Sequence, residues 1–158
     1  MTYIIEGVPR ERFAELFGLD NAALAARGAR RVVASGEGFP CRVSLVDAEP
    51  GESLILLNYV SHDVAGPYRA THAILVREQT EQAPTYIDRI PPVFTQRTLS
   101  LRGFDASGDL VASRVSKPDE HEQAIADLLA DPQVDHIDAH NAGHGCFSAR
   151  IERYMGAA

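Results

Sequence analysis

The sequence contains few cysteines and no export signal. Cys41 and Cys146 are the two cysteines among 158 residues, too few to form the disulfide framework of a small secreted domain. The first residues lack the basic region, long apolar core and small-residue cleavage site of a secretory signal. We therefore expect a cytoplasmic protein in which both thiols are reduced.

The sequence also lacks a positive charge excess and a long hydrophobic run. It has 15 Lys and Arg against 22 Asp and Glu, which gives a net charge of -7. Nucleic-acid binding requires a clustered positive surface, and no stretch approaches the length of a membrane span. Neither nucleic acid nor a membrane is an expected partner.

Signature motifs of the common enzyme classes are missing. There is no Walker loop, dinucleotide-binding fingerprint, serine nucleophile elbow or zincin sequence. Their absence argues against phosphate transfer, hydride transfer on a Rossmann domain and the common hydrolase reactions. Whether the protein is an enzyme stays open, because catalysis does not require one of these motifs.

The length and composition indicate one domain over residues 1–158, with 45% hydrophobic residues and no repeat. Residues 1–36 are expected to be mainly helical, with helices over 9–19 and 20–26. Residues 37–158 are expected to be β-rich, with one helix near 117–130 that Ser116 caps. These patterns predict an α+β fold in which a largely antiparallel sheet is covered by helices. The predicted strands cover residues 3–8, 31–34, 41–46, 53–60, 72–77, 97–104 and 110–115. Residues 53–60 are apolar on both faces, which predicts a central strand. Residues 105–109, with Gly108, predict a hairpin loop between the last two strands.

Residues 135–154 contain four of the six histidines together with Asp138, Asn141 and Cys146. Alternating runs on both sides of the Asn-Ala-Gly-His-Gly segment predict a β-hairpin. On its first strand, His136, Asp138 and His140 share one face. On its second strand, the predicted apolar face holds Phe147, Ala149 and Ile151, and the polar face holds Cys146, Ser148, Arg150 and Glu152.

Five short motifs follow one another in an order that resembles a known family. The chain is similar to the bacterial domain of unknown function 1203 family, small proteins with no assigned activity. The resemblance implies recurring features around Cys41, Asp47, Tyr68, Asn141 and Cys146. It does not require histidine at positions 72, 140 or 144, which favours Asn141, Cys146 and the arginines as site residues. The motifs are Phe39-Pro40-Cys41-Arg42, residues 47–52, Gly66-Pro67-Tyr68, residues 128–132, and Asn141-Ala142 followed by Gly145-Cys146-Phe147.

A ligand-binding pocket is the first functional hypothesis. Guanidinium groups bind carboxylates and phosphates through paired hydrogen bonds. The candidate residues are Arg42, Tyr68, Arg69, Asn141 and Arg150, and Arg77 is a further candidate arginine. Arginines at strand ends also commonly pair with surface carboxylates.

A thiol site is the second hypothesis. Cys146 would act as nucleophile or redox residue, with His140, His144 or His136 as base and Arg150 favouring the thiolate. The alternative is an inert cysteine packed against its neighbours. Cys41 alternates with Val43 and Leu45 and is expected in the core.

A divalent metal is the third hypothesis, with His136, Asp138 and His140 as candidate ligands and His144 and Cys146 in the adjacent loop. Alternate residues of a strand are spread about 7 Å apart, so ligands from elsewhere would be needed. We therefore expect no resident metal or other cofactor.

These patterns favour a protein that binds a small polar or anionic ligand between the 141–150 hairpin and the 41–68 region. The alternatives are a small enzyme that uses Cys146 and a non-catalytic interaction module. The last could form a homodimer through an exposed sheet edge.

Overall fold

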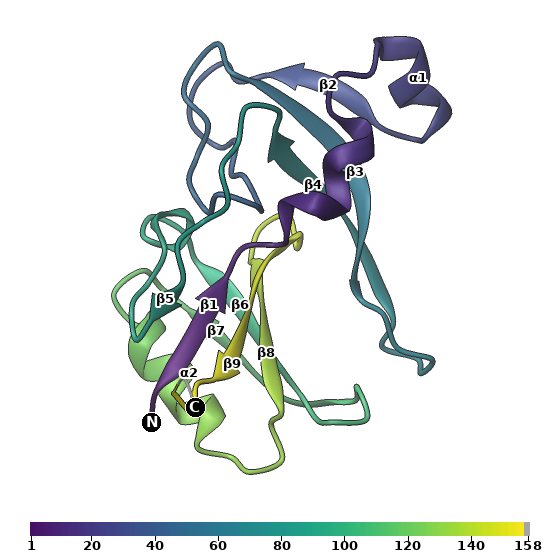
Figure 1. Cartoon of the computed structure of the whole chain (residues 1–158). Coiled ribbons are helices and arrows are strands. Elements are labelled where there is room, and N and C mark those ends of the chain that lie inside the picture. Colours follow the sequence, from purple (N-terminus) through teal and green to yellow (C-terminus); the bar gives the residue numbers. More distant parts are fainter. Residues whose placement is uncertain (157–158) are drawn as a thin grey trace.

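The structure is a computed structural model that describes residues 1–156, and it contains two antiparallel β-sheets (Figure 1). The six-stranded sheet has the order β5-β1-β9-β8-β6-β7, and the three-stranded sheet has the order β2-β3-β4. The predicted α+β class is confirmed, although the strands form two sheets instead of one. The strands are β1 (Tyr3–Glu6), β2 (Arg30–Val33), β3 (Ser53–His62), β4 (Ala70–Arg77), β5 (Tyr86–Ile87), β6 (Leu99–Phe104), β7 (Leu110–Ser116), β8 (His136–Asn141) and β9 (Phe147–Arg153).

Two predicted hairpins are confirmed, and a glycine turn closes each of them. β6 pairs with β7 through a turn in which Gly108 has a φ of 90°. β8 pairs with β9 through a turn in which Gly145 has a φ of 80°. Glycine adopts these positive φ angles without the steric cost that a Cβ atom imposes.

The central position of β3 explains its unbroken apolar sequence. Leu54 and Ile55 are fully buried and face opposite sides of the strand. They belong to two different apolar clusters. A strand that is covered on both faces needs apolar residues on both faces, so the predicted central strand is confirmed.

The later helix is confirmed as α2 (His121–Leu129), and its stripe of Ala124, Ile125, Leu128 and Leu129 is buried. Its predicted cap is wrong. Ser116 belongs to β7, and its hydroxyl lies 2.7 Å from Nδ1 of His121. The Glu120 carboxylate instead accepts from the Lys117 backbone N–H, so the carboxylate closes the turn that leads into the helix.

The N-terminal part contains less α-helix than its pattern predicts. The predicted helix over residues 9–19 is a 3-10 helix, η1 (Arg10–Leu16). The second predicted helix is present as α1 (Asn21–Ala26), and the Asp20 side chain caps it by accepting from the Ala23 backbone N–H at 2.8 Å. A second 3-10 helix, η2 (Pro92–Phe94), follows Pro91.

Residues 41–46 do not form the predicted strand. Leu45 has a φ of 54°, and its N–H donates to the Cys41 carbonyl. An isolated bridge joins Pro40 and Asp47, so the segment turns back on itself. Cys41, Val43 and Leu45 are all fully buried. Their alternation therefore reflects burial, and a compact turn can bury these side chains without pairing as a strand.

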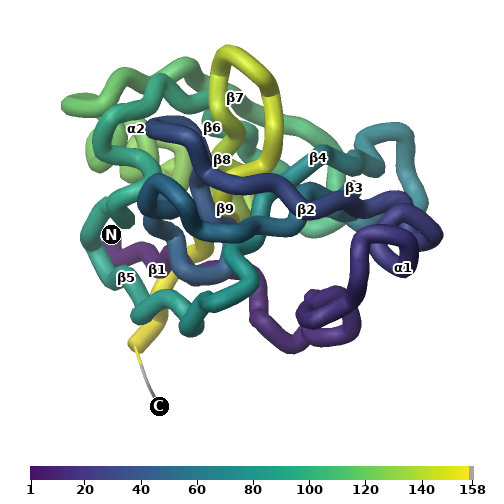
Figure 2. Tube along the Cα trace, turned by 90° about the horizontal axis from the view of Figure 1, so that it is seen from above, coloured from purple at the N-terminus to yellow at the C-terminus, as the bar shows by residue number. Residues whose placement is uncertain are grey.

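The two sheets stand one above the other, and the long β3–β4 hairpin extends from the three-stranded sheet down beside β8 (Figure 1). The main apolar cluster lies between the six-stranded sheet and α2 and includes Ile137, Ala139 and Ile151. A second cluster joins the sheets through Val8, Ile74, Val76 and Phe147. The view from above shows α1 at the edge of the molecule, beyond β2 and β3 (Figure 2).

The β8–β9 register explains one error in the predicted faces. A register shift between Ala139 and His140 brings His140 opposite Phe147. Phe147 consequently packs against Tyr59, with ring centroids 5.8 Å apart, instead of sharing the face of Ala149 and Ile151. Sequence alternation does not show this bulge, because Phe147, Ser148 and Ala149 still alternate between apolar and polar residues, while the extra residue moves Phe147 to the other face of the strand.

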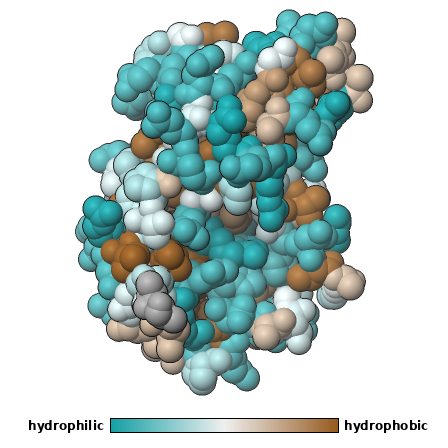
Figure 3. Space-filling view, in the orientation of Figure 1, coloured by the Kyte–Doolittle hydropathy of each residue, from teal (hydrophilic) through white to brown (hydrophobic). Residues whose placement is uncertain are grey.

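The visible surface is mostly hydrophilic, with apolar residues in small separate groups (Figure 3). None of the helices among residues 1–156 combines the length and the apolar composition that crossing a membrane would require.

Candidate functional site

A cavity of about 680 Å³ separates β4 from the β8–β9 turn. The apolar wall of the cavity is formed by residues of β3 and β4, namely Leu56, Ala73, Ile74 and Leu75. Several polar side chains line the same cavity, as is usual for small-molecule sites. The side chains that could contact a ligand there are Arg42, His72, Arg97, Asn141, His144 and Cys146.

Arg42 lies at the base of this Cys146 cavity and is only 2% exposed. Its Nε donates to the Phe147 carbonyl at 2.8 Å, and its Nη1 donates to the Pro40 carbonyl at 2.7 Å. Its Nη2 donates to the Cys146 Sγ at 3.1 Å. The turn over residues 41–46 holds the arginine in place, because the Arg42 backbone N–H donates to the Leu75 carbonyl and its carbonyl accepts from Val8.

The charge of Arg42 lacks a carboxylate partner among residues 1–156, because the guanidinium forms no ion pair with an acidic side chain there. Burial lowers the pKa of Arg42, and the neighbouring Cys146 sulfur acts in the opposite direction. Arginine nevertheless stays charged in proteins, so the cavity contains a buried cation that no carboxylate among the described residues neutralises. Arg97 differs, since Asp47 pairs with it through two hydrogen bonds of 2.7 and 3.1 Å.

Cys146 and Asn141 complete the polar side of the cavity. Cys146 is partly exposed, and its Sγ accepts from Asn141 Nδ2 at 3.4 Å as well as from Arg42. Asn141 Oδ1 is buried without a hydrogen-bond partner among residues 1–156. A buried acceptor of this kind costs free energy unless a donor reaches it. The sulfur thus receives two donors, and the amide oxygen leaves one acceptor free for a ligand.

None of the three predicted histidine bases forms a hydrogen bond with the thiol in the part of the chain that the structure describes, and His136 lies beside Asp135 instead. His140 Nδ1 lies 2.9 Å from the Gly145 carbonyl, and its ring packs on Phe147 and His72. His144 lines the cavity from an exposed position in the turn. His72, which sequence reasoning did not select, lines the cavity from β4. Burial and the positive charge of Arg102 lower the pKa of His72.

The remaining predicted ligand-binding residues lie elsewhere. Arg150 pairs with Asp138 through hydrogen bonds of 2.7 and 3.1 Å and lines a different cavity of about 380 Å³. Arg69 pairs with Asp63 at the surface. Tyr68 is 43% exposed and packs edge-on against Phe104. The structure therefore brings Arg42, Asn141 and Cys146 together, but not Tyr68, Arg69 or Arg150.

Cys41 does not line the Cys146 cavity. It is fully buried, and both cysteines are free thiols. Burial raises the pKa of Cys41, but hydrogen bonds from Ser44, Arg77 and Val43 outweigh that effect and lower it overall. The two thiols differ in access, because Cys41 is fully buried and Cys146 is partly exposed.

Three metal-ligating groups also come together, although not the three that the sequence suggests. His62, His136 and Asp138 each offer a ligand atom, and these atoms lie within 4.8 Å of one another. His140 does not belong to this group, because its ring turns toward His72. His62 lies at the end of β3, about 75 residues before β8, so no local spacing connects it with His136.

Comparison with known proteins provides a family but no characterised relative. No curated protein and no solved structure matches the chain. One family model matches residues 38–153, more than two thirds of the chain. That range includes the turn around Arg42, both sheets except β1 and β2, and the β8–β9 hairpin. The chain therefore belongs to the family described as Protein of unknown function (DUF1203).

Proposed function

We propose that this protein binds a small anionic ligand in the Cys146 cavity. The observation that supports the proposal is the buried charge of Arg42, which no carboxylate among residues 1–156 neutralises. Removing a charge from water is costly unless an opposite charge compensates it. An anion in the cavity would supply that compensation.

The hydrogen-bond inventory of Arg42 supports such a ligand. A guanidinium carries five N–H groups, and three of them donate to Phe147, Pro40 and Cys146. Two remain for an oxyanion at the cavity. The free Asn141 Oδ1 can accept from a hydroxyl or protonated group of the same ligand.

The apolar wall indicates the rest of the ligand. Leu56, Ala73, Ile74 and Leu75 form the apolar part of the cavity lining. A small carboxylate with a short hydrocarbon chain would place its charge at Arg42 and its chain against this wall. Apolar surface removed from water contributes roughly 25 cal/mol per Å², so affinity should increase with chain length until the cavity is full.

A series of linear carboxylates from butanoate to octanoate, with the corresponding neutral amides, tests the proposal by calorimetry. The carboxylates should bind at least about tenfold more tightly than the amides, because charge-assisted hydrogen bonds are stronger than neutral ones. Arg42→Lys should weaken carboxylate binding by about tenfold, since lysine lacks the planar donor pair. Arg69→Lys makes the same chemical change at an exposed surface pair and should leave binding unchanged.

Protection of Cys146 from alkylation gives a second test in the unaltered protein. A bound carboxylate should slow the reaction with iodoacetamide, because the ligand would cover Sγ. Equal binding of acids and amides, or no protection by any acid, would contradict the proposal.

Thiol chemistry at Cys146 is a second candidate function, favoured by the two donors on its sulfur. Hydrogen bonds from a guanidinium and an amide stabilise a thiolate, which is the reactive form. Cys146 should then be alkylated in the folded protein at neutral pH, while the fully buried Cys41 stays unmodified. Arg42→Lys should slow the reaction. Mass spectrometry of each cysteine over a pH series measures this, and two equally slow thiols would exclude the thiol function.

A further inference from the structure

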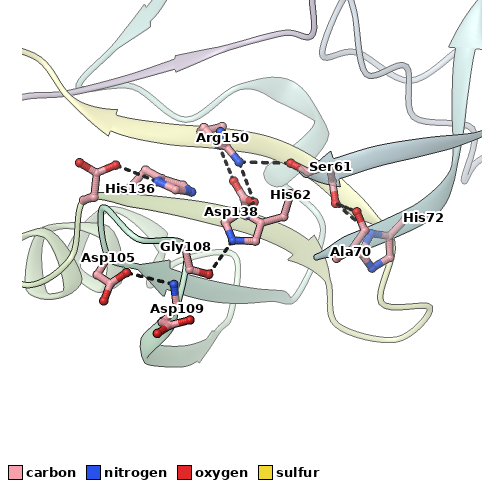
Figure 4. Close-up of polar contacts among 11 residues, drawn as sticks. Ser61, His62, Ala70, His72, Asp105, Gly108, Asp109, His136, Asp138 and Arg150 are labelled. Carbon is pink, nitrogen blue, oxygen red and sulfur yellow. Dashed lines mark hydrogen bonds and ion pairs between the residues drawn. The ribbon is translucent and has the colours of Figure 1, made fainter. Parts of the chain in front are cut away.

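His62, His136 and Asp138 form a buried cluster outside the Cys146 cavity (Figure 4). His136 and Asp138 lie on the same face of β8, and His62 approaches them from the end of β3. His62 is 2% exposed, His136 is 8% exposed and Asp138 is 1% exposed. Buried imidazoles beside a carboxylate require an explanation, because each unpaired polar atom there costs free energy.

The hydrogen bonds of the two imidazoles determine where their lone pairs point. His62 Nε2 lies 2.8 Å from the Gly108 carbonyl oxygen. A carbonyl only accepts, so Nε2 carries a hydrogen, and the neutral ring that binds a metal has its lone pair on Nδ1, 3.9 Å from Asp138 Oδ2. This separation is too long for a hydrogen bond. His62 Nδ1 therefore faces the carboxylate as an available ligand atom.

His136 repeats this arrangement with the opposite nitrogen. Its Nδ1 lies 3.0 Å from the Asp135 carboxylate, which accepts the Nδ1 hydrogen. Its Nε2 then carries the lone pair, is buried, and has no hydrogen-bond partner among residues 1–156. Histidine ligands of metal ions characteristically donate their other N–H to a carboxylate or a backbone carbonyl. Both histidines of the cluster do so.

The distances suit a first-row metal ion after a small adjustment. Three atoms within 4.8 Å of one another all lie within about 2.8 Å of a common point, compared with typical bond lengths of about 2.0–2.2 Å for Zn²⁺ with imidazole and carboxylate. Asp138 is held by Arg150, and a carboxylate has about four lone-pair sites, so it can accept from Arg150 and bind a metal at once.

The surroundings favour a cation and give it access. A cavity of about 380 Å³ adjoins His62 and His136, so positions on the ion would remain open to water or a ligand. Its lining has two arginines, Arg12 and Arg150. The carboxylates that line the same cavity are Glu6, Asp63, Asp105, Asp135 and Glu152.

The geometry points to a binding site for a divalent transition-metal ion, with His62 Nδ1, His136 Nε2 and the Asp138 carboxylate as ligands. Two imidazoles, one carboxylate and open positions match the preferences of Zn²⁺ and Fe²⁺. Asp135 and the Gly108 carbonyl act as positioning groups that orient the two rings. The site does not depend on anion binding in the Cys146 cavity, because the ligands of the metal do not line that cavity.

Calorimetric titration with Zn²⁺, after removal of metals by a chelator and dialysis, tests the inference. The Cys146→Ser protein is the reference, so that the partly exposed thiol cannot bind the ion. It should bind one equivalent of Zn²⁺, and Co²⁺ should bind at the same site with visible absorption bands. His62→Gln and His136→Gln should each weaken Zn²⁺ binding by at least about tenfold.

Two further variants make the result decisive. Asp135→Asn changes a side chain that is 57% exposed, so the protein should fold. Zn²⁺ binding should weaken by about tenfold, because a neutral amide is a weaker acceptor than a carboxylate for the His136 Nδ1–H and orients the ring less firmly. His144→Gln removes an exposed histidine outside the cluster and should leave binding unchanged. Circular dichroism verifies the fold of each variant. The inference is overturned if the folded reference protein shows no saturable binding, or if folded Asp135→Asn binds Zn²⁺ as tightly as the reference.

Discussion

His140 shows how burial changes the chemistry of one residue. Burial lowers the pKa of His140 from 6.5 to about 4, although the hydrogen bond to the Gly145 carbonyl opposes that shift. At neutral pH the imidazole is therefore uncharged. This state fits a packing role against Phe147 and His72, and it leaves the imidazole too weak a base for the function that the sequence pattern suggested.

The shift of His140 predicts a pH dependence of stability. Between pH 6.5 and about 4 the unfolded chain binds a proton at this residue that the folded protein does not bind. The stabilisation present at neutral pH is thus lost as the pH falls through this range, up to about 3 kcal/mol. Urea unfolding at a series of pH values measures the loss.

A matched pair of variants assigns this dependence to His140. In His140→Gln the free energy of unfolding should decrease less over the same pH range, because glutamine binds no proton in either the folded or the unfolded protein. His144→Gln, at an exposed position of the same hairpin, should retain the wild-type profile. Identical profiles for wild type and His140→Gln would show that other groups cause the pH dependence.

At the scale of elements, the segment after β1 depends on a close backbone approach. A Cβ atom at Gly7 would lie 2.1 Å from the Val43 carbonyl oxygen and 3.2 Å from that of Arg42. Only glycine allows this approach, which also aligns the hydrogen bond from the Val8 N–H to the Arg42 carbonyl. The strand end therefore supports the turn that holds Arg42 at the Cys146 cavity.

Gly7→Ala should destabilise the protein by about 2 kcal/mol or more, because both contacts are with backbone that can move only by displacing the turn. Gly36→Ala is the control, since a Cβ atom there meets no atom within 4 Å. Chemical denaturation measures both. Equal stabilities would mean that the turn adjusts freely, and Arg42 would then lack the rigid support described above.

For the whole molecule, the apolar cluster between the sheets predicts a single unfolding transition. Phe147 from the six-stranded sheet packs with Ile74 and Val76 from the three-stranded sheet. Phe147→Ala should cost about 3 kcal/mol or more, and the unfolding of both sheets should shift together. Circular dichroism and tyrosine fluorescence should give coincident curves. Separate transitions would indicate two units and contradict the predicted single domain.

Local patterns in the sequence were sufficient for much of the fold. Alternation and turn glycines predicted the β6–β7 and β8–β9 hairpins, and the apolar stripe predicted α2. These features depend on neighbours within a few residues, where periodicity and φ preferences operate. The family resemblance also rested on short local motifs, and the family model confirms it.

Tertiary structure decided which reactive groups meet. The sequence drew attention to Arg42, Asn141 and Cys146, but only the fold shows that Arg42 contacts a sulfur 104 positions later in the chain. The fold also shows that His62, and not His140, belongs to the metal-ligating cluster. Such contacts depend on how the β3–β4 hairpin packs against β8, and long-range packing leaves no periodic signal in the sequence. Hairpin positions and the periodicity of α2 were therefore determined by the sequence alone, because they depend on neighbouring residues. The face of Phe147 and the partners of each buried charge and lone pair were decided by the three-dimensional packing.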